Sequence, residues 1–336
     1  MSNYLRIGLF LFLFLFPPPE SRAQDLDERV FRQSRMIMGT SVEITVSQTD
    51  SQRAEGAMAA AFREVERIDW LMSHYRQESE VSQITRHAGE REIPVSPETL
   101  EVIERALYFS RLSGGAFDIT IGPVFRLWNF REGKIPEEKS LRETLKKVDY
   151  RKIKVDPLKS SVYLESRGME LDLGAIAKGY AADRAAAVLG QGGVKNFLVN
   201  AGGDLTVSGA KGNGVPWSIG IQHPRLPSEL LVKLRPVQAA VATSGDYEKF
   251  FFKGRERYHH ILTPSTGLPA RECQSVTIMA PSAMDADALA TSIFVLGPKD
   301  GFALLERLPD VHAIIADRRG SVLLSTRWPP GILSPP

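Results

Sequence analysis

The spacing of apolar residues predicts two long helices in the first third of the chain. Between residues 51 and 72, apolar side chains recur every three or four positions and so share one helix face, at Met58, Phe62, Val65, Ile68 and Met72. A second helix is predicted over 96–112. Ser96 is a good N-cap for it, Pro97 suits its first turn, and Gly114–Gly115 ends the pattern.

Short runs of strand-forming residues dominate the rest of the chain. A strand is predicted at 35–47, and others at 162–165, 196–200, 204–208, 217–221, 231–234, 239–243, 275–280, 312–317 and 322–325. Helices are predicted between them at 176–189, 283–295 and 300–308, with a charged helical excursion within 133–154. Because strands and helices do not alternate regularly, we expect an α+β fold of mixed, largely antiparallel sheets with flanking helices. No linker is evident, which favours a single domain with two lobes over residues 24–336.

Composition and charge narrow the classes of partner. Of the 336 residues, 43% are hydrophobic and 24% are charged, which is typical of a globular protein. The 42 basic and 40 acidic residues leave a net charge of +2, which gives no argument for a nucleic-acid partner. Cys273 is the only cysteine, so an intramolecular disulfide is excluded. No basic or metal-binding motif surrounds Cys273, and we expect it to be a packing residue.

The amino terminus has the pattern of a secretory signal peptide. Arg6 precedes an apolar run over 7–16, and Ser21 and Ala23 form a small-residue cleavage pattern, which predicts a signal peptide over 1–23. The apolar run is too short to cross a bilayer, although a short uncleaved anchor is the alternative. No cysteine lies near the cleavage position, so lipid attachment there is excluded. We expect an exported, periplasmic protein.

The segment Ala280–Gly297 combines a helix start with a possible metal site. Ser282 followed by Asp285 matches a capping box, which gives Asp285 a structural role. Asp287 and Thr291 are four residues apart and share a helix face, where a carboxylate and a hydroxyl suit Mg²⁺. Taken alone, this pair is explained at least as well by a solvated helix face with a threonine bonded to the backbone.

A second candidate segment, Leu171–Tyr180, is predicted to be a short strand that ends at Gly174 and leads into a helix. Exposed backbone groups at such a junction can hold a metal or a phosphate. Lys178 lies one turn into the helix, where its ammonium group could face a pyrophosphate. A closely packed Ala/Gly helix with a surface lysine is the simpler account of this segment alone.

Two further segments carry aromatic and titratable residues. In 114–130, Phe117 and Asp118 follow a Gly-rich approach that could meet a heteroaromatic ring, whereas Trp128 and Phe130 are expected to be core residues.

In 242–267, His259 and His260 are adjacent in a predicted short strand and must point to opposite faces, so only one can serve a given site. That one could take a proton at neutral pH, and the other is expected to be structural. The sequence has no H-E-x-x-H, G-x-S-x-G or P-loop motif, and 209–214 is predicted to be a turn.

In their order and content, these segments resemble the ApbE-type FAD:protein FMN transferase family over roughly Met36 to Thr326. The matching stretches are M-G-T from Met38, Y-R-Q-E-S-E-V-S from Tyr75, G-G-A-F-D, L-D-L-G-A-I-A-K-G-Y, V-N-A-G-G-D, A-T-S-G-D-Y, H-I-L-T-P-S-T-G and D-A-D-A-L-A-T-S. The resemblance implies an FAD site lined by Met38, Tyr75, Ala116, Phe117, Asp118, Asp172, Lys178 and Ile261. It also implies that Mg²⁺ is held by the backbone carbonyl of Ala175 and the side chains of Asp287 and Thr291, with His260 as the base.

The activity that the resemblance implies is the transfer of the FMN half of FAD to a Thr or Ser hydroxyl of an acceptor flavoprotein, with release of AMP. Redox-pump subunits and flavin-dependent reductases are the acceptors it implies. An FAD pyrophosphatase and a periplasmic FAD-binding protein without turnover are the alternatives. Thr263 and Ser265 depart from the family pattern, which usually has Asp or Asn and a basic residue there, and they could alter the rate or the choice of acceptor.

Overall fold

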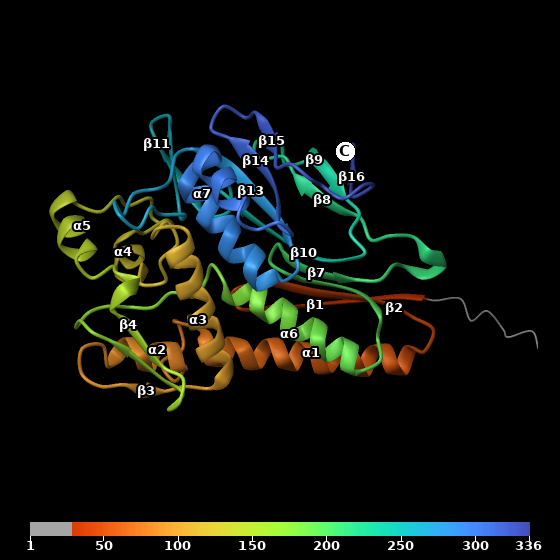
Figure 1. The fold of residues 1–336 in the computed structure, drawn as a ribbon, viewed down its shortest axis with the longest axis horizontal. Coiled ribbons are helices and arrows are strands. Elements are labelled where there is room, and N and C mark those ends of the chain that lie inside the picture. The colour runs from red at the N-terminus through yellow and green to blue at the C-terminus, as the bar shows by residue number, and fades with distance from the viewer. Residues whose placement is uncertain (1–28) are drawn as a thin grey trace, which may run out of the picture.

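An eight-stranded antiparallel sheet forms the centre of the computed structural model, which describes residues 29–336 (Figure 1). Its strands lie in the order β1 (Arg29–Ile37), β2 (Thr40–Gln48), β6 (Asn196–Ala201), β7 (Asp204–Ser208), β10 (Gln238–Gly245), β13 (Cys273–Ala280), β14 (His312–Asp317) and β15 (Val322–Leu324). The signal peptide predicted for 1–23 lies outside the described residues.

Three helices cover one face of this sheet (Figure 1). They are α1 (Ser51–Met72) on β1 and β2, α6 (Ala177–Gln191) on β6 and β7, and α7 (Ala283–Leu305) on β10 and β13. Apolar side chains of both layers, such as Ile44 and Phe294, form the main core. By length and composition α7 could span a membrane, the one such helix within residues 29–336, but over half of its apolar stretch is buried, as in a core helix.

The opposite face of the sheet is covered by a smaller antiparallel sheet of β8 (Ile219–Gln222), β9 (Leu230–Leu234) and β16 (Leu333–Ser334). Because side chains alternate along a strand, Val241 of β10 contributes to the core on this side, while Ala240 and Ala242 contribute to the core under the helices. Trp217 and Leu234 complete this second core. The central strands of the large sheet are therefore buried on both faces, whereas the edge strands β1 and β15 stay largely exposed.

A second lobe lies beside the end of α1. It contains α2 (Glu80–Arg86), β3 (Ile93–Pro94), α3 (Pro97–Leu112), α4 (Gly122–Leu127), α5 (Glu138–Leu145), β4 (Ile153–Asp156) and β5 (Ser161–Leu164), with the strands in the order β3-β5-β4. The hairpin β11 (Phe250–Lys253) and β12 (Glu256–His259) joins it through an aromatic cluster. Trp128, the buried centre of that cluster, donates its indole N–H to the carbonyl of Gly267 at 2.9 Å, and Phe130 stacks on it.

The predicted fold class is confirmed, and several elements match closely. α1 covers the predicted residues, and α3 starts one residue later than predicted, with Ser96 as its N-cap. Trp128 is buried, as expected, and so is Cys273 in β13, where burial raises the pKa of its thiol to about 12. The strands of the large sheet from β6 onward agree with the predictions to within a few residues.

Other predictions were wrong in detail. The strand predicted at 35–47 is a hairpin, because Met38 and Gly39 both adopt positive φ angles and turn the chain. No strand precedes Gly174; instead an extended segment donates the Asp172 N–H to the carbonyl of Ile119. The helices predicted at 283–295 and 300–308 are the two parts of α7, which is kinked at Gly297. Only 138–145 is α-helical within 133–154. The hairpin β11–β12 was not predicted as such.

Candidate active site

A cavity of about 1000 Å³ opens where the second lobe meets the large sheet. It is bounded by the β1–β2 turn, the end of α1, the loop at 116–121, the start of α6, the β6–β7 turn, the segment after β10, and α7. All of the residues predicted for the site line it: Met38, Tyr75, Ala116, Phe117, Asp118, Asp172, Ala175, Lys178, His260, Ile261, Asp287 and Thr291. The structure thus brings together residues that are up to 253 positions apart, from Met38 to Thr291, while the individual roles stay predictions.

A buried charge cluster occupies the floor of this cavity. The Lys178 ammonium group, in the first turn of α6, lies 2.5 Å from a carboxylate oxygen of Asp204 and 3.2 Å from one of Asp287. Both carboxylates are almost fully buried. One cation therefore faces two anions, so the cluster has a surplus negative charge.

The close approach of two helices builds this cluster. A Cβ atom at Gly179 of α6 would lie 2.1 Å from the carbonyl oxygen of Ala283 in α7, so only glycine fits there. The approach allows the backbone N–H of Gly179 to donate to the Asp287 carboxylate at 3.3 Å. The Ala/Gly-rich start of α6, which by itself indicated only close packing, thereby brings Lys178 next to α7.

The surplus charge perturbs the titration of the cluster. Burial and the neighbouring charge of Asp287 raise the pKa of Asp204 well above its ordinary value, and the attraction of Lys178 offsets only part of this effect. Burial alone would lower the pKa of Lys178, but the two carboxylates outweigh burial and raise it. Lys178 therefore stays charged. One further positive charge, either a proton or a metal ion, would stabilise the two carboxylates.

The donors around the cluster fit a magnesium ion. Thr291 lies one helical turn after Asp287, and its hydroxyl is 3.0 Å from the hydroxyl of Ser244 on β10. Within 29–336, no three His, Cys, Asp or Glu residues are grouped as a metal site. A site here would thus need other oxygen donors, such as the Thr291 hydroxyl and the carbonyl of Ala175, which also line the cavity. Hard oxygen donors beside a surplus negative charge are what Mg²⁺ prefers.

The capping prediction for Asp285 was half wrong. The Ser282 hydroxyl does accept the N–H of Asp285 at the start of α7. The Asp285 carboxylate does not return to the cap, because both of its oxygens accept from the Arg105 guanidinium, at 2.7 and 2.5 Å. Asp183 of α6 instead accepts the first backbone N–H groups of α7. Sequence spacing could not reveal this partner from another helix.

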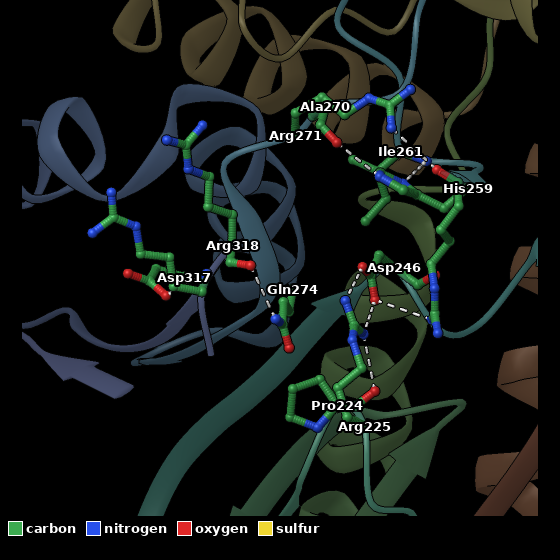
Figure 2. A network of polar contacts seen from close by, with 12 residues as sticks. Pro224, Arg225, Asp246, His259, Ile261, Ala270, Arg271, Gln274, Asp317 and Arg318 are labelled. Carbon is green, nitrogen blue, oxygen red and sulfur yellow. Dashed lines mark hydrogen bonds and ion pairs between the residues drawn. The ribbon is translucent and has the colours of Figure 1, made fainter. Parts of the chain in front are cut away.

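The two histidines have separate environments, as predicted. His259 is buried with its Nε2 atom 2.8 Å from the carbonyl of Ala270, which makes it structural (Figure 2). His260 lines the cavity, and its Nδ1 atom is buried without a hydrogen-bond partner in the described part of the chain. Burial, helped by the charge of Lys249, lowers the pKa of His260 to about 4. The imidazole is therefore neutral at pH 7.

Two carboxylates predicted to line the flavin site, Asp118 and Asp172, have different environments. The Asp118 carboxylate is buried and accepts from Thr120 and from the N–H of Tyr150, so it holds its own loop in shape. The Asp172 carboxylate lies 3.4 Å from His74 Nδ1, whose ring in turn contacts the exposed Tyr75. Burial alone would raise the pKa of Asp172, but the hydrogen bond and charge of His74 lower it.

Sequence reasoning missed three parts of the site. Asp204 follows the Gly202–Gly203 turn and was treated as part of a turn motif, although a carboxylate leading into a buried strand is itself a signal. His74 gave no signal beyond its place beside Tyr75. Asp246 accepts two hydrogen bonds of 2.6 Å from Arg225, which lies in the β8–β9 loop (Figure 2).

The ion pair at Asp246 fixes the segment that carries His260. Asp246 follows β10 directly, and Arg257 of β12 also approaches its carboxylate, at 3.4 Å. The hairpin β11–β12 is thereby tied to the end of β10 through Arg257, which pairs with Phe252 one position from the last strand pair before the turn. His260 is the residue after β12 and lines the cavity, and its backbone N–H donates to the carbonyl of Lys249 at 3.0 Å.

Comparison with known proteins agrees with the predicted family. The model of the ApbE family matches residues 38–315. The chain is 34% identical over 313 residues to a FAD:protein FMN transferase of Treponema pallidum, covering 87% of this chain and 86% of that protein. A FAD:protein FMN transferase of Klebsiella pneumoniae is 33% identical, with 89% and 93% covered.

Solved structures show the same fold. The ApbE protein of Thermotoga maritima superposes with a TM-score of 0.81 at 35% identity, covering 89% of this chain and 97% of that one. The flavin transferase ApbE from Vibrio cholerae superposes with a TM-score of 0.79 at 30% identity, covering 89% and 98%. The family match over most of the chain, the identities and the shared fold show that this protein belongs to the ApbE family.

Proposed function

We propose that this protein is an exported, Mg²⁺-dependent FAD:protein FMN transferase, which moves the FMN half of FAD to a Thr or Ser hydroxyl of an acceptor protein and releases AMP. The observation that most directly supports this proposal is that one cavity combines a carboxylate cluster of surplus negative charge with a neutral histidine. Two relatives that match most of the chain are named FAD:protein FMN transferase.

The cluster on the cavity floor is suited to binding a pyrophosphate together with a metal ion. Asp287, Thr291 and the carbonyl of Ala175 would hold Mg²⁺, with Asp204 beside them. When bound, Mg²⁺ neutralises pyrophosphate charge and stabilises the charge that develops on the departing AMP. Lys178 stays protonated and supplies a second positive charge at the same place.

His260 is suited to be the base. The acceptor hydroxyl oxygen forms a bond to the FMN-side phosphorus while the bond from that phosphorus to the AMP oxygen breaks. The hydroxyl proton passes to the imidazole ring of His260, which lines the cavity. The products are a phosphoester-linked flavoprotein, AMP and one proton, so atoms and charge balance.

An exported enzyme would carry out this reaction outside the cytoplasm. The signal peptide predicted for 1–23 supports a periplasmic enzyme, whose acceptors are exported proteins such as redox-pump subunits or flavin-dependent reductases.

The test is incubation of the purified protein with FAD, MgCl₂ and an exported redox-pump subunit, followed by mass spectrometry of AMP and of the acceptor peptides. Equal amounts of AMP and of an FMN-modified Thr or Ser peptide are expected. Release of FMN and AMP at the same rate without acceptor would identify a pyrophosphatase. Tight retention of FAD without AMP would identify a flavin-binding protein.

A further inference from the structure

The hairpin β11–β12 carries an unusual exposed surface. Phe250 and Phe252 are two residues apart on β11 and lie on the same side of it, with 36% and 58% of their surface exposed. Phe251, between them, points to the other side, where it stacks on Tyr258 and joins the aromatic cluster around Trp128. The hairpin thus has a side that packs on the body and a side with two uncovered phenyl rings.

A cation fixes the two exposed rings. The Arg257 guanidinium carbon lies 4.1 Å from the ring centre of Phe250 and 5.1 Å from that of Phe252, and the rings meet edge to face. Arg257 is itself held by the Asp246 carboxylate at 3.4 Å. The group of Phe250, Phe252 and Arg257, called here the Phe252 face, is therefore preorganised, which lowers the entropic cost of binding a partner.

The hairpin carries a surplus of positive charge, although Glu248 precedes it and Arg257 pairs with Asp246. Between Lys249 and Arg257, four cationic residues accompany a single glutamate, Glu256, which already pairs with Arg271 at 2.7 Å. Lys253 and Arg255 flank the hairpin turn and are exposed. Such a surface is complementary to a segment that combines carboxylates with apolar side chains.

The chain segments on either side of the hairpin line the cavity. Tyr247, Glu248 and Lys249, which lead into β11, line the cavity wall, and so does His260, which follows β12. A protein that rests on this face would therefore contact a hairpin whose two ends lie in the cavity wall. Phenyl rings and cations on a hairpin also suit a lipid surface, but the place of the hairpin next to residues of the cavity wall favours a protein substrate.

We propose that the Phe252 face, with Lys253 and Arg255, is the docking site for the acceptor protein, which contributes an acidic and apolar segment near the modified hydroxyl. This proposal rests on the proposed transferase function and adds to it a second contact outside the cavity. The enzyme would thereby recognise a folded acceptor, and the cavity would recognise FAD and the hydroxyl.

The test compares a folded acceptor with a short peptide. The double variant Phe250→Ser/Phe252→Ser is assayed with an exported redox-pump subunit and with a synthetic peptide of about ten residues around its modified threonine. We expect KM for the folded subunit to rise about tenfold or more, since aromatic residues dominate binding energy at interfaces. KM for the peptide, kcat at saturation and the affinity for FAD are expected to stay within about twofold.

The charge is tested separately. Lys253→Glu/Arg255→Glu is expected to raise KM for the folded subunit and to weaken its dependence on salt. Arg63→Glu, on the exposed side of α1, is the matched charge control, and Leu158→Ser, in the β4–β5 turn, is the matched apolar control. Both controls are expected to behave as wild type.

Three outcomes would overturn the docking proposal. The first is an unchanged KM for the folded subunit in both double variants. The second is an equal loss with subunit and peptide, which would make the hairpin part of the cavity. The third is unchanged kinetics with lost binding to vesicles that contain anionic phosphatidylglycerol, which would identify a membrane contact. If the wild type modifies neither acceptor, the proposed transferase function fails instead.

Discussion

The two sides of the first turns of α7 use the same residue types but differ in charge balance. On the outer side, Asp285 forms a bidentate ion pair with Arg105, so one anion meets one cation. On the inner side, Asp287 and Asp204 share the single cation of Lys178. A balanced pair needs nothing more, whereas an unbalanced buried pair is stabilised by any further cation. The difference indicates which aspartate has a functional role, although the two are only two residues apart.

The largest expected effect tests the inner side directly. Asp287→Ala removes a predicted metal ligand and the surplus charge together, and we expect Mg²⁺-dependent AMP release to fall about a thousandfold or more. AMP release is measured by chromatography over a range of MgCl₂ concentrations. Thermal unfolding without Mg²⁺ is the control and is expected to change little, because Lys178 keeps Asp204 as a partner. Retained turnover would show that the inner side is structural.

A second change separates the base from the metal cluster. His260→Gln keeps the size of the side chain but removes the basic nitrogen, and we expect turnover to fall about a hundredfold with unchanged dependence on Mg²⁺. His259→Gln is the matched control. It should affect stability more than turnover, because His259 bonds to the carbonyl of Ala270.

The pH dependence gives an independent check on His260. Its pKa is about 4 in the folded protein, against about 6.5 in an unfolded chain, so the unfolded state binds more protons between these values. The contribution of His260 to stability is therefore complete above pH 6.5 and is lost as the pH falls toward 4. We expect the wild-type free energy of unfolding to fall over this range more steeply than that of His260→Gln, as measured by urea titration at several pH values.

A smaller effect is expected for the second carboxylate of the inner side. In Asp204→Asn, Lys178 loses its closer partner and pairs more fully with Asp287, where it competes with Mg²⁺. We expect the concentration of Mg²⁺ that gives half-maximal turnover to rise about 10- to 100-fold, while kcat at saturating Mg²⁺ is largely kept. An unchanged Mg²⁺ requirement would place Asp204 outside the metal site.

The smallest effect belongs to the outer side. Asp285→Ala breaks the partly exposed ion pair with Arg105, and we expect a loss of about 1 kcal/mol in the free energy of unfolding, measured with urea. The N-cap stays, because Ser282 and Asp183 provide it. Turnover is expected to remain within about twofold of wild type. If Asp285→Ala abolished turnover and Asp287→Ala did not, the two sides of α7 would have exchanged their roles.

Features that depend on residues close together in the sequence could be predicted from it. Local periodicity located α1 and α3, and helix spacing placed Asp287 with Thr291 on one side of α7, because these depend on neighbours within four residues. The turn at Met38 was hidden because methionine gives no turn signal and both flanking strands have suitable patterns.

Partners from distant segments could not be predicted in the same way. Arg105 lies 180 residues before Asp285, and Asp204 is 83 residues before Asp287, so no spacing rule joins them. The family resemblance selected the residues that line the cavity, but it did not reveal that Lys178 is shared by two carboxylates. That feature depends on the close packing of α6 on α7 at Gly179.

The solitary thiol in β13 has a consequence for the proposed export of the protein. Cys273 is buried, and its raised pKa keeps it as an unreactive thiol rather than a thiolate. The chain has no second cysteine with which to form a crosslink. Maturation in an oxidising compartment therefore needs no disulfide-forming catalyst, and folded molecules are protected from covalent pairing with one another.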